Sequence, residues 1–207
     1  MEKQRYYSLW LCAILVIAYL IQVLVPGFTE MFMLTSEAFP NVWQFFTAIF
    51  LHGSLIHLLF NLFALFLFGL MLEALVGSRK FLLIFIITGI LANLISWYWS
   101  PNALGASGAI FGVIGVLVIL KPMMGVWAFG MILPMFVAAI LWVGAALLGV
   151  FGFGDQGIGY WAHLSGIVLG MFYGVWLRIR RREPPYERGI KLPEEAIRNW
   201  EDYYIRP

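Results

Sequence analysis

Long apolar runs, separated by short polar or glycine-containing breaks, make up most of the chain. A helix that crosses a membrane needs about 20 consecutive, mostly apolar residues. From this pattern we predict six membrane-spanning helices, over residues 8–25, 56–76, 81–99, 107–121, 126–150 and 160–177. The expected fold is therefore all-α, a polytopic helical bundle in residues 1–178, with a charged tail at 179–207.

Residues 28–47 fit neither a clean span nor a soluble loop, because they mix aromatic and polar side chains. Aromatic residues such as Trp43 are typical of the headgroup layer of a bilayer. We therefore expect an interfacial element that lies partly in that layer.

The composition indicates a membrane protein rather than a soluble one. The chain is 62% hydrophobic and 12% charged, whereas soluble domains carry about 45–50% apolar and about 25% charged residues. The single cysteine, Cys12, excludes a disulfide framework within the chain and a cysteine-based metal site. No His-Glu-x-x-His motif occurs, which argues against a metalloprotease, and we expect neither a metal nor a cofactor. No basic stripe with interleaved aromatics appears outside the tail, which argues against a nucleic-acid partner.

The charged residues predict the orientation. With six spans, all 13 Lys and Arg fall on one side of the membrane, at both ends of the chain and in the turns at 77–80 and 121–125. The three loops on the opposite side contain none, and five or seven spans would spoil this partition. Because positively charged loops stay in the cytoplasm, we expect an integral protein of the cell (inner) membrane with both termini cytoplasmic.

The fourth predicted helix is too short to cross the bilayer alone. From Ser107 to Lys121 it rises roughly 21 Å at about 1.5 Å per residue, against a hydrocarbon core of about 30 Å. If Lys121 lies at the cytoplasmic surface, Ser107 lies on the order of 10 Å below the outer one. Irregular backbone is tolerated at that depth only inside protein or beside water. We therefore expect an outward-facing wet cavity with Ser107 at its floor.

Ser107 is the first candidate for chemistry. It begins a helix between small residues, in the stretch Gly105-Ala106-Ser107-Gly108, and the free N–H groups of a helix N-terminus favour an anion. A sharp loop-to-helix turn would hold the hydroxyl out for nucleophilic attack. The alternative is a small residue that only helps helices to pack.

His163 is the candidate base. Gly166, Gly170 and Gly174 recur every four residues on the face of the sixth predicted helix that carries His163, and such a face lets another helix approach closely. If that helix is the fourth, His163 and Ser107 meet near the outer side. The alternative is a histidine that is merely hydrogen-bonded within the bundle, although ionisable residues inside membranes are usually functional.

His57 and Asn61 lie at i and i+4, on one face of the second predicted helix. Both can donate a hydrogen bond, and such donors stabilise the negative charge of a tetrahedral intermediate. The alternative is a polar contact that only joins helices. His52 is expected at the interface without a chemical role, and Glu73 as a structural ion pair or cap. Because the acidic residues near the outer face all lie in loops, a Ser-His dyad needs fewer assumptions than a triad.

Together these residues resemble the rhomboid family of intramembrane serine proteases, over nearly the whole chain. The resemblance depends on three motifs, in the order and at the spacing of the six-helix prokaryotic type: His57-Leu58-Leu59-Phe60-Asn61, Gly105-Ala106-Ser107-Gly108 and His163-x-x-Gly166-x-x-x-Gly170.

The resemblance implies roles for individual residues. Ser107 would be the nucleophile and His163 the general base and then the general acid. His57, Asn61 and the backbone N–H of Ser107 would form the oxyanion hole. Phe111 would be the aromatic on which the histidine packs, at a position where many members carry Tyr.

The resemblance also implies partners and one departure from the family pattern. Implied substrates are single-span or polytopic membrane proteins, cut within the lipid bilayer near the outer face. Glu73 resembles the family's acidic residue near the cytoplasmic end of the second helix. The first loop of the family usually carries Trp-Arg, whereas here Trp43 precedes Gln44, which bears on the bracing of that loop rather than on the chemistry.

Two other functions are compatible with the pattern. A non-proteolytic rhomboid-like protein would bind membrane clients without cutting them, but such proteins usually lack the serine or the histidine. A small transporter or channel could use His57 and His163 as a proton relay. It would show pH-driven flux in liposomes and no labelling by a serine-directed probe.

Overall fold

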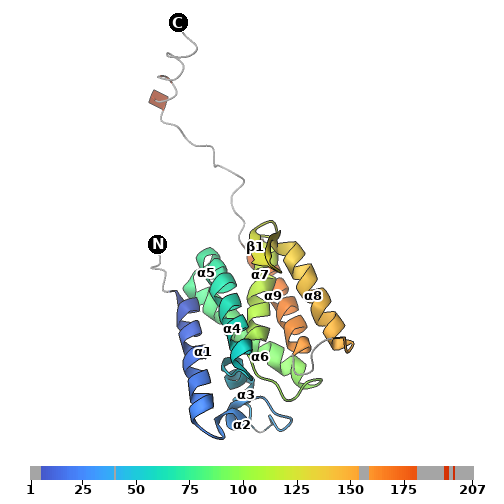
Figure 1. Cartoon of the computed structure of the whole chain (residues 1–207). Helices are drawn as coiled ribbons and strands as arrows, with labels where there is room; N and C mark the ends of the chain where they lie inside the picture. Colours follow the sequence, from blue (N-terminus) through green and yellow to red (C-terminus); the bar gives the residue numbers. More distant parts are fainter. Residues whose placement is uncertain (1–5, 40, 154–158, 181–193, 196–197, 199–207) are drawn as a thin grey trace.

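The computed structural model describes residues 6–39, 41–153, 159–180, 194, 195 and 198 of the chain (Figure 1). In these residues the fold is helical apart from one two-stranded hairpin. The predicted charged tail at 179–207 lies mostly outside the described residues, so its boundary at 178 stays a prediction. The cations Lys3 and Arg5 and the acidic Asp155 also lie outside them.

Four helices of the described chain are long and apolar enough to cross a membrane. They are α1 (Tyr7–Leu24), the continuous α4–η2–α5 segment (Leu55–Val76), α6 (Ser78–Trp97) and α9 (Tyr160–Arg180). Two shorter apolar helices are α7 (Ser107–Leu120) and α8 (Met135–Val150). The pattern of apolar residues therefore predicted the positions of these six helical segments, although α6 begins three residues before its predicted start at residue 81 and only four of the six are long enough to span a membrane.

The prediction of a helix over the whole of 126–150 is wrong. Residues 125–134 instead form the antiparallel strands β1 (Gly125–Ala128) and β2 (Met131–Pro134). Phe129 and Gly130 make the two-residue turn, with φ of 54° and 79°, and positive φ at both positions is the geometry that matches the twist of a hairpin. Pro134 ends β2 and is the residue directly before α8.

Three short helical pieces connect α1 to α4: α2 (Phe28–Phe32), α3 (Gln44–Thr47) and η1 (Ala48–Phe50). The loop between α2 and α3 is held by side chains. Thr35 donates to Gln44 Oε1 from its backbone N (3.2 Å) and its hydroxyl (2.9 Å), and Trp97 Nε1 donates to the Thr35 carbonyl (2.8 Å). Gln44, at the position where the resemblance described above would lead us to expect arginine, thus braces the loop through a neutral amide.

The first turn of α1 is capped by a carboxylate from a distant helix. Glu73 of α5 is fully buried and accepts hydrogen bonds from the backbone N–H groups of Tyr7 (2.7 Å) and Ser8 (2.9 Å) and from the Ser8 hydroxyl (2.7 Å). A negative charge at a helix N-terminus is stabilised by the helix dipole and by these free donors. Of the two roles expected for Glu73, a structural ion pair or a helix cap, the structure therefore supports the cap.

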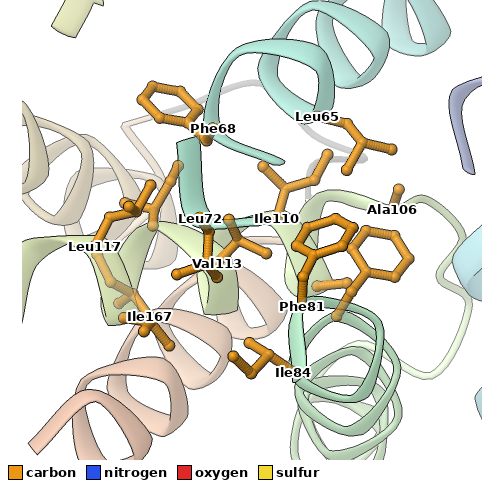
Figure 2. Close-up of a cluster of buried hydrophobic side chains, with 14 of the residues drawn as sticks. Leu65, Phe68, Leu72, Phe81, Ile84, Ala106, Ile110, Val113, Leu117 and Ile167 are labelled. Atoms are coloured by element: carbon orange, nitrogen blue, oxygen red, sulfur yellow. The ribbon is translucent and has the colours of Figure 1, made fainter. Parts of the chain in front are cut away.

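Helix α7 lies at the centre of the bundle and packs against α6 and α9. Its buried side chains join those of the neighbouring helices in one hydrophobic cluster (Figure 2), which includes Leu65, Phe68, Leu72, Phe81, Ile84, Ile110, Val113, Leu117 and Ile167. A Cβ added at Gly166 or Gly170 of α9 would overlap the carbonyl oxygens of Gly108 and Gly112 of α7. Backbone therefore lies against backbone between α7 and α9, a contact that only glycine permits.

Candidate active site

Ser107 is the first residue of α7 and is presented by a turn that requires glycine. Gly105 has φ of +132°, a conformation that other residues rarely adopt. Its N–H donates to the Ala48 carbonyl at 2.8 Å, which anchors the turn to η1. A Cβ at Gly105 would also approach His57 Cε1 to 2.8 Å. Both the backbone angle and the space beside His57 therefore exclude a side chain here.

The hydroxyl of Ser107 and the imidazole of His163 are in contact. Ser107 Oγ lies 2.8 Å from His163 Nε2, a hydrogen-bond distance, although the two residues are 56 positions apart in the chain. The close approach of α7 and α9 through Gly108 and Gly166 is what brings them together. This is the spatial arrangement in which an imidazole can take the proton of a serine hydroxyl.

Aromatic rings enclose the imidazole of His163. Phe111, one turn after Ser107 on α7, stacks on it with ring centroids 4.4 Å apart and an angle of 9° between the planes. Tyr160, one turn before His163 on α9, meets it edge-on at 6.2 Å and 81°. Within the described residues no carboxylate hydrogen-bonds to His163, so packing rather than a third polar residue orients the ring.

The other two predicted site residues belong to α4. The Ser54 hydroxyl caps the helix by accepting from the N–H of His57 (3.1 Å), and Asn61 Nδ2 donates to the His57 carbonyl (2.8 Å). The contact of Gly105 with the imidazole places His57 beside the turn that carries Ser107. One N–H of the Asn61 amide remains available beyond this bond, since a primary amide has two.

His52, which was expected at the membrane interface, is buried inside the protein. Its side chain is 1% exposed, and its ring lies edge-on to that of His57 with centroids 5.0 Å apart. Burial, and next the charge of His57, lower the pKa of His52 to about 4. His52 is therefore neutral at pH 7, and its ring packs against that of His57 while neither of its buried ring nitrogens has a hydrogen-bond partner among the described residues.

The backbone of His52 is fixed by the first helix. Gln22 of α1 accepts from the His52 N–H (2.9 Å) and donates to the His52 carbonyl (3.2 Å), and its amide also donates to Thr29 (3.0 Å). Sequence reasoning missed this clamp because the partners are 30 residues apart and no motif joins them. A polar side chain near the end of an otherwise apolar helix was the available signal.

The arrangement can perform acyl transfer. It combines a hydroxyl, an imidazole in hydrogen-bond contact with it, and a second imidazole and an amide on the adjacent helix α4. Preorganised donors of this kind stabilise the oxyanion of a tetrahedral intermediate. Among the residues that the structure describes, no group of three or more His, Cys, Asp or Glu side chains could hold a metal ion.

Comparison with known proteins supports the same reading. The model of the rhomboid domain matches residues 40–180. The chain is 30% identical to rhomboid protease GlpG of Haemophilus influenzae over 181 residues, which cover 84% of this chain and 92% of that protein. It is 33% identical to rhomboid-like protein 11, chloroplastic, of Arabidopsis thaliana over 164 residues, 74% of this chain and 58% of that one. It is 45% identical to rhomboid protease GluP of Bacillus subtilis over 76 residues, 36% of this chain and 15% of that one.

Proposed function

The chain belongs to the rhomboid family of intramembrane serine proteases, and from this premise we propose that it hydrolyses peptide bonds in membrane-protein substrates by means of a Ser107–His163 dyad. The observation that carries the proposal is the distance of 2.8 Å between Ser107 Oγ and His163 Nε2. The absence of a carboxylate partner for His163, among the residues described, favours a dyad over a triad.

In the first step Ser107 Oγ attacks the carbonyl carbon of the scissile bond. A new C–O bond forms while the hydroxyl proton passes to His163 Nε2. The imidazolium then gives this proton to the leaving amine, the C–N bond breaks and an acyl-enzyme remains. A water molecule, deprotonated by the same imidazole, hydrolyses the ester and restores the serine.

The negative charge of each tetrahedral intermediate falls on the former carbonyl oxygen. We assign its stabilisation to three donors: the side chains of His57 and Asn61 and the backbone N–H of Ser107. The position of Ser107 at the first residue of α7 supports this assignment, because N–H groups there have no partner within the helix. The helix dipole adds to the stabilisation.

We further propose that the chain crosses the membrane six times and cuts near the outer face. Helix α7 has 14 residues, which rise about 21 Å and cannot cross a core of about 30 Å unaided. Ser107 would then lie below the outer surface, in a cavity that water reaches. The cations at the opposite end support cytoplasmic termini in the cell (inner) membrane.

A substrate helix must unwind locally before its carbonyl can reach Ser107. Its freed backbone groups need water or protein partners, which the lipid cannot supply. Single-span or polytopic membrane proteins with a helix-breaking segment near the outer face are therefore the expected substrates.

The direct test is cleavage of a model single-span substrate by the purified protein in liposomes. We expect Ser107→Ala to abolish cleavage while its thermal midpoint stays at the wild-type value, since only an oxygen atom is removed. Unchanged turnover would refute the assignment of Ser107 as the nucleophile. A wild-type protein that binds the substrate but never cuts it would favour the non-proteolytic alternative.

A further inference from the structure

Tyr160 is close to both the imidazole of His163 and the backbone of helix α8. It is the first residue of α9 and therefore one turn from His163, whose ring it meets edge-on at 6.2 Å. Phe111 covers a face of the same imidazole. The ring of His163 is thus held by one hydrogen bond, to Ser107, and by two aromatic contacts.

The other side of Tyr160 rests on bare backbone. A Cβ built at Gly149 of α8 would overlap three atoms of the Tyr160 ring, Cζ, Cε1 and Cε2. The other glycine of α8, Gly144, is different, because a Cβ built there would have no heavy atom within 4 Å. Only Gly149 is therefore required for space, and what needs that space is the ring of Tyr160.

The opposite half of α8 is held by other contacts. Trp142 meets Phe68 of η2 (Leu65–Gly69) at 5.4 Å and 88°, and Phe129 of the hairpin turn at 5.9 Å. Gly149 lies seven residues beyond Trp142, about 10 Å further along the helix axis. Figure 1 shows α8 at the edge of the bundle beside α9. The contact of Gly149 with Tyr160 thus ties the C-terminal end of α8 to α9.

We propose that Tyr160 is a positioning residue for His163, and that Gly149 seats its ring, so that the C-terminal end of α8 sets the orientation of the imidazole toward Ser107. The inference rests on the proposed function of the dyad. A hydrogen bond weakens steeply with angle, and no carboxylate among the described residues fixes His163, so a small displacement of Tyr160 reaches the reacting atoms. Helix α8 and the base are thereby coupled.

The test compares Y160A, Y160F, G149A and G144A in liposomes. For each variant we would measure kcat and KM for a membrane substrate, the rate at which a small fluorophosphonate labels Ser107, and the thermal midpoint. We expect Y160A and G149A to lower kcat and the labelling rate in parallel by about tenfold, with KM within about twofold of wild type, because misplacing a catalytic group acts on the chemical step. The contacts with His163 and Gly149 are both made by the aromatic ring and not by the hydroxyl, so Y160F should keep kcat and the labelling rate near those of wild type.

G144A is the matched control, because it adds the same methyl group to the same helix where space is free. In the double variant Y160A/G149A the methyl group added at position 149 has no ring to displace. The double variant should therefore lose no more kcat or labelling rate than Y160A alone. If Y160A fails to fold, Y160L, which keeps a large side chain without an aromatic ring, replaces it in this comparison of single and double variants.

Three results would overturn the inference: G149A indistinguishable from G144A, additive losses in the double variant, or a rise in KM at an unchanged labelling rate. Failure of the proposed function is distinguishable from these, because wild type itself would then neither cut the substrate nor be labelled.

Discussion

At the scale of single residues, the site depends on positions where no side chain fits. Gly105 satisfies two demands at once, a φ of +132° and contact with the imidazole of His57. A Cβ at Gly166 would overlap the carbonyl oxygen of Gly108, so the bare backbone of α9 lies against α7 beside the contact of Ser107 with His163. The reactive geometry therefore follows from glycines that themselves take no part in the chemistry.

Asn61 offers a test of the oxyanion hole. We expect Asn61→Ala to lower kcat by about 10²-fold with little change in KM, since a lost oxyanion donor acts on the transition state and not on substrate binding. The measurement is steady-state cleavage of a membrane substrate in liposomes. A change confined to KM would assign Asn61 to substrate binding and refute its role as a donor.

Sequence reasoning located the residues that belong to motifs and missed those that act through distant contacts. The N-terminal position of Ser107 and the four-residue glycine repeat around His163 predicted that α7 and α9 meet. His52 and Tyr160 carry no such signal. Their roles depend on which helix lies beside them, which local pattern does not specify.

At the scale of elements, the apolar pattern predicted the positions of the six long apolar helical segments, but it did not predict the hairpin at 125–134 or the short helices α2 and α3. Residues 125–134 are nearly as apolar as the helix that follows, so hydropathy alone merged them with α8. The π-helical turn η2 within the α4–α5 segment was also missed, because one extra residue in a uniformly apolar helix leaves no mark on the pattern. Some helix boundaries, by contrast, coincide with glycine or proline, such as Gly77 between α5 and α6 and Pro134 before α8.

The packing of α7 against α9 can be tested at Gly170. A Cβ there would overlap the carbonyl oxygen of Gly112, so we expect Gly170→Ala to lower the free energy of unfolding by about 1–3 kcal/mol, the usual cost of overpacking. Gly144→Ala, where the space is open, should instead gain up to about 1 kcal/mol from helix propensity. Equal effects of the two substitutions, measured by denaturant unfolding in detergent, would contradict the close contact.

At the scale of the whole molecule, the two ends of the bundle differ. The start of α1, the hairpin and the end of α9 lie together at one end, and α2 and α3 lie at the other (Figure 1). Lys121 and Arg178 belong to the first of these ends, where Arg178 donates to the Ile119 carbonyl at the close of α7 (3.2 Å). Ser107 begins the same helix and therefore faces the end without these cations.

This asymmetry predicts which loops face the cell interior. In a Cys12→Ala background, a cysteine replacing Tyr98 (80% exposed) should react with an impermeant maleimide on intact cells, and one replacing Met123 (74% exposed) only after lysis. The reason is that the positive end stays in the cytoplasm. Reaction of both, or of the second alone, on intact cells would contradict the proposed orientation.

The central claim is that the His163 imidazole activates the Ser107 hydroxyl, and the most direct measurement is the rate and site of labelling by a fluorophosphonate. We predict one probe per chain, attached to Ser107 and identified by mass spectrometry, and a labelling rate about 10²–10⁴-fold lower in a folded His163→Ala variant. Equal labelling of the two proteins, or a probe attached elsewhere, would contradict the account.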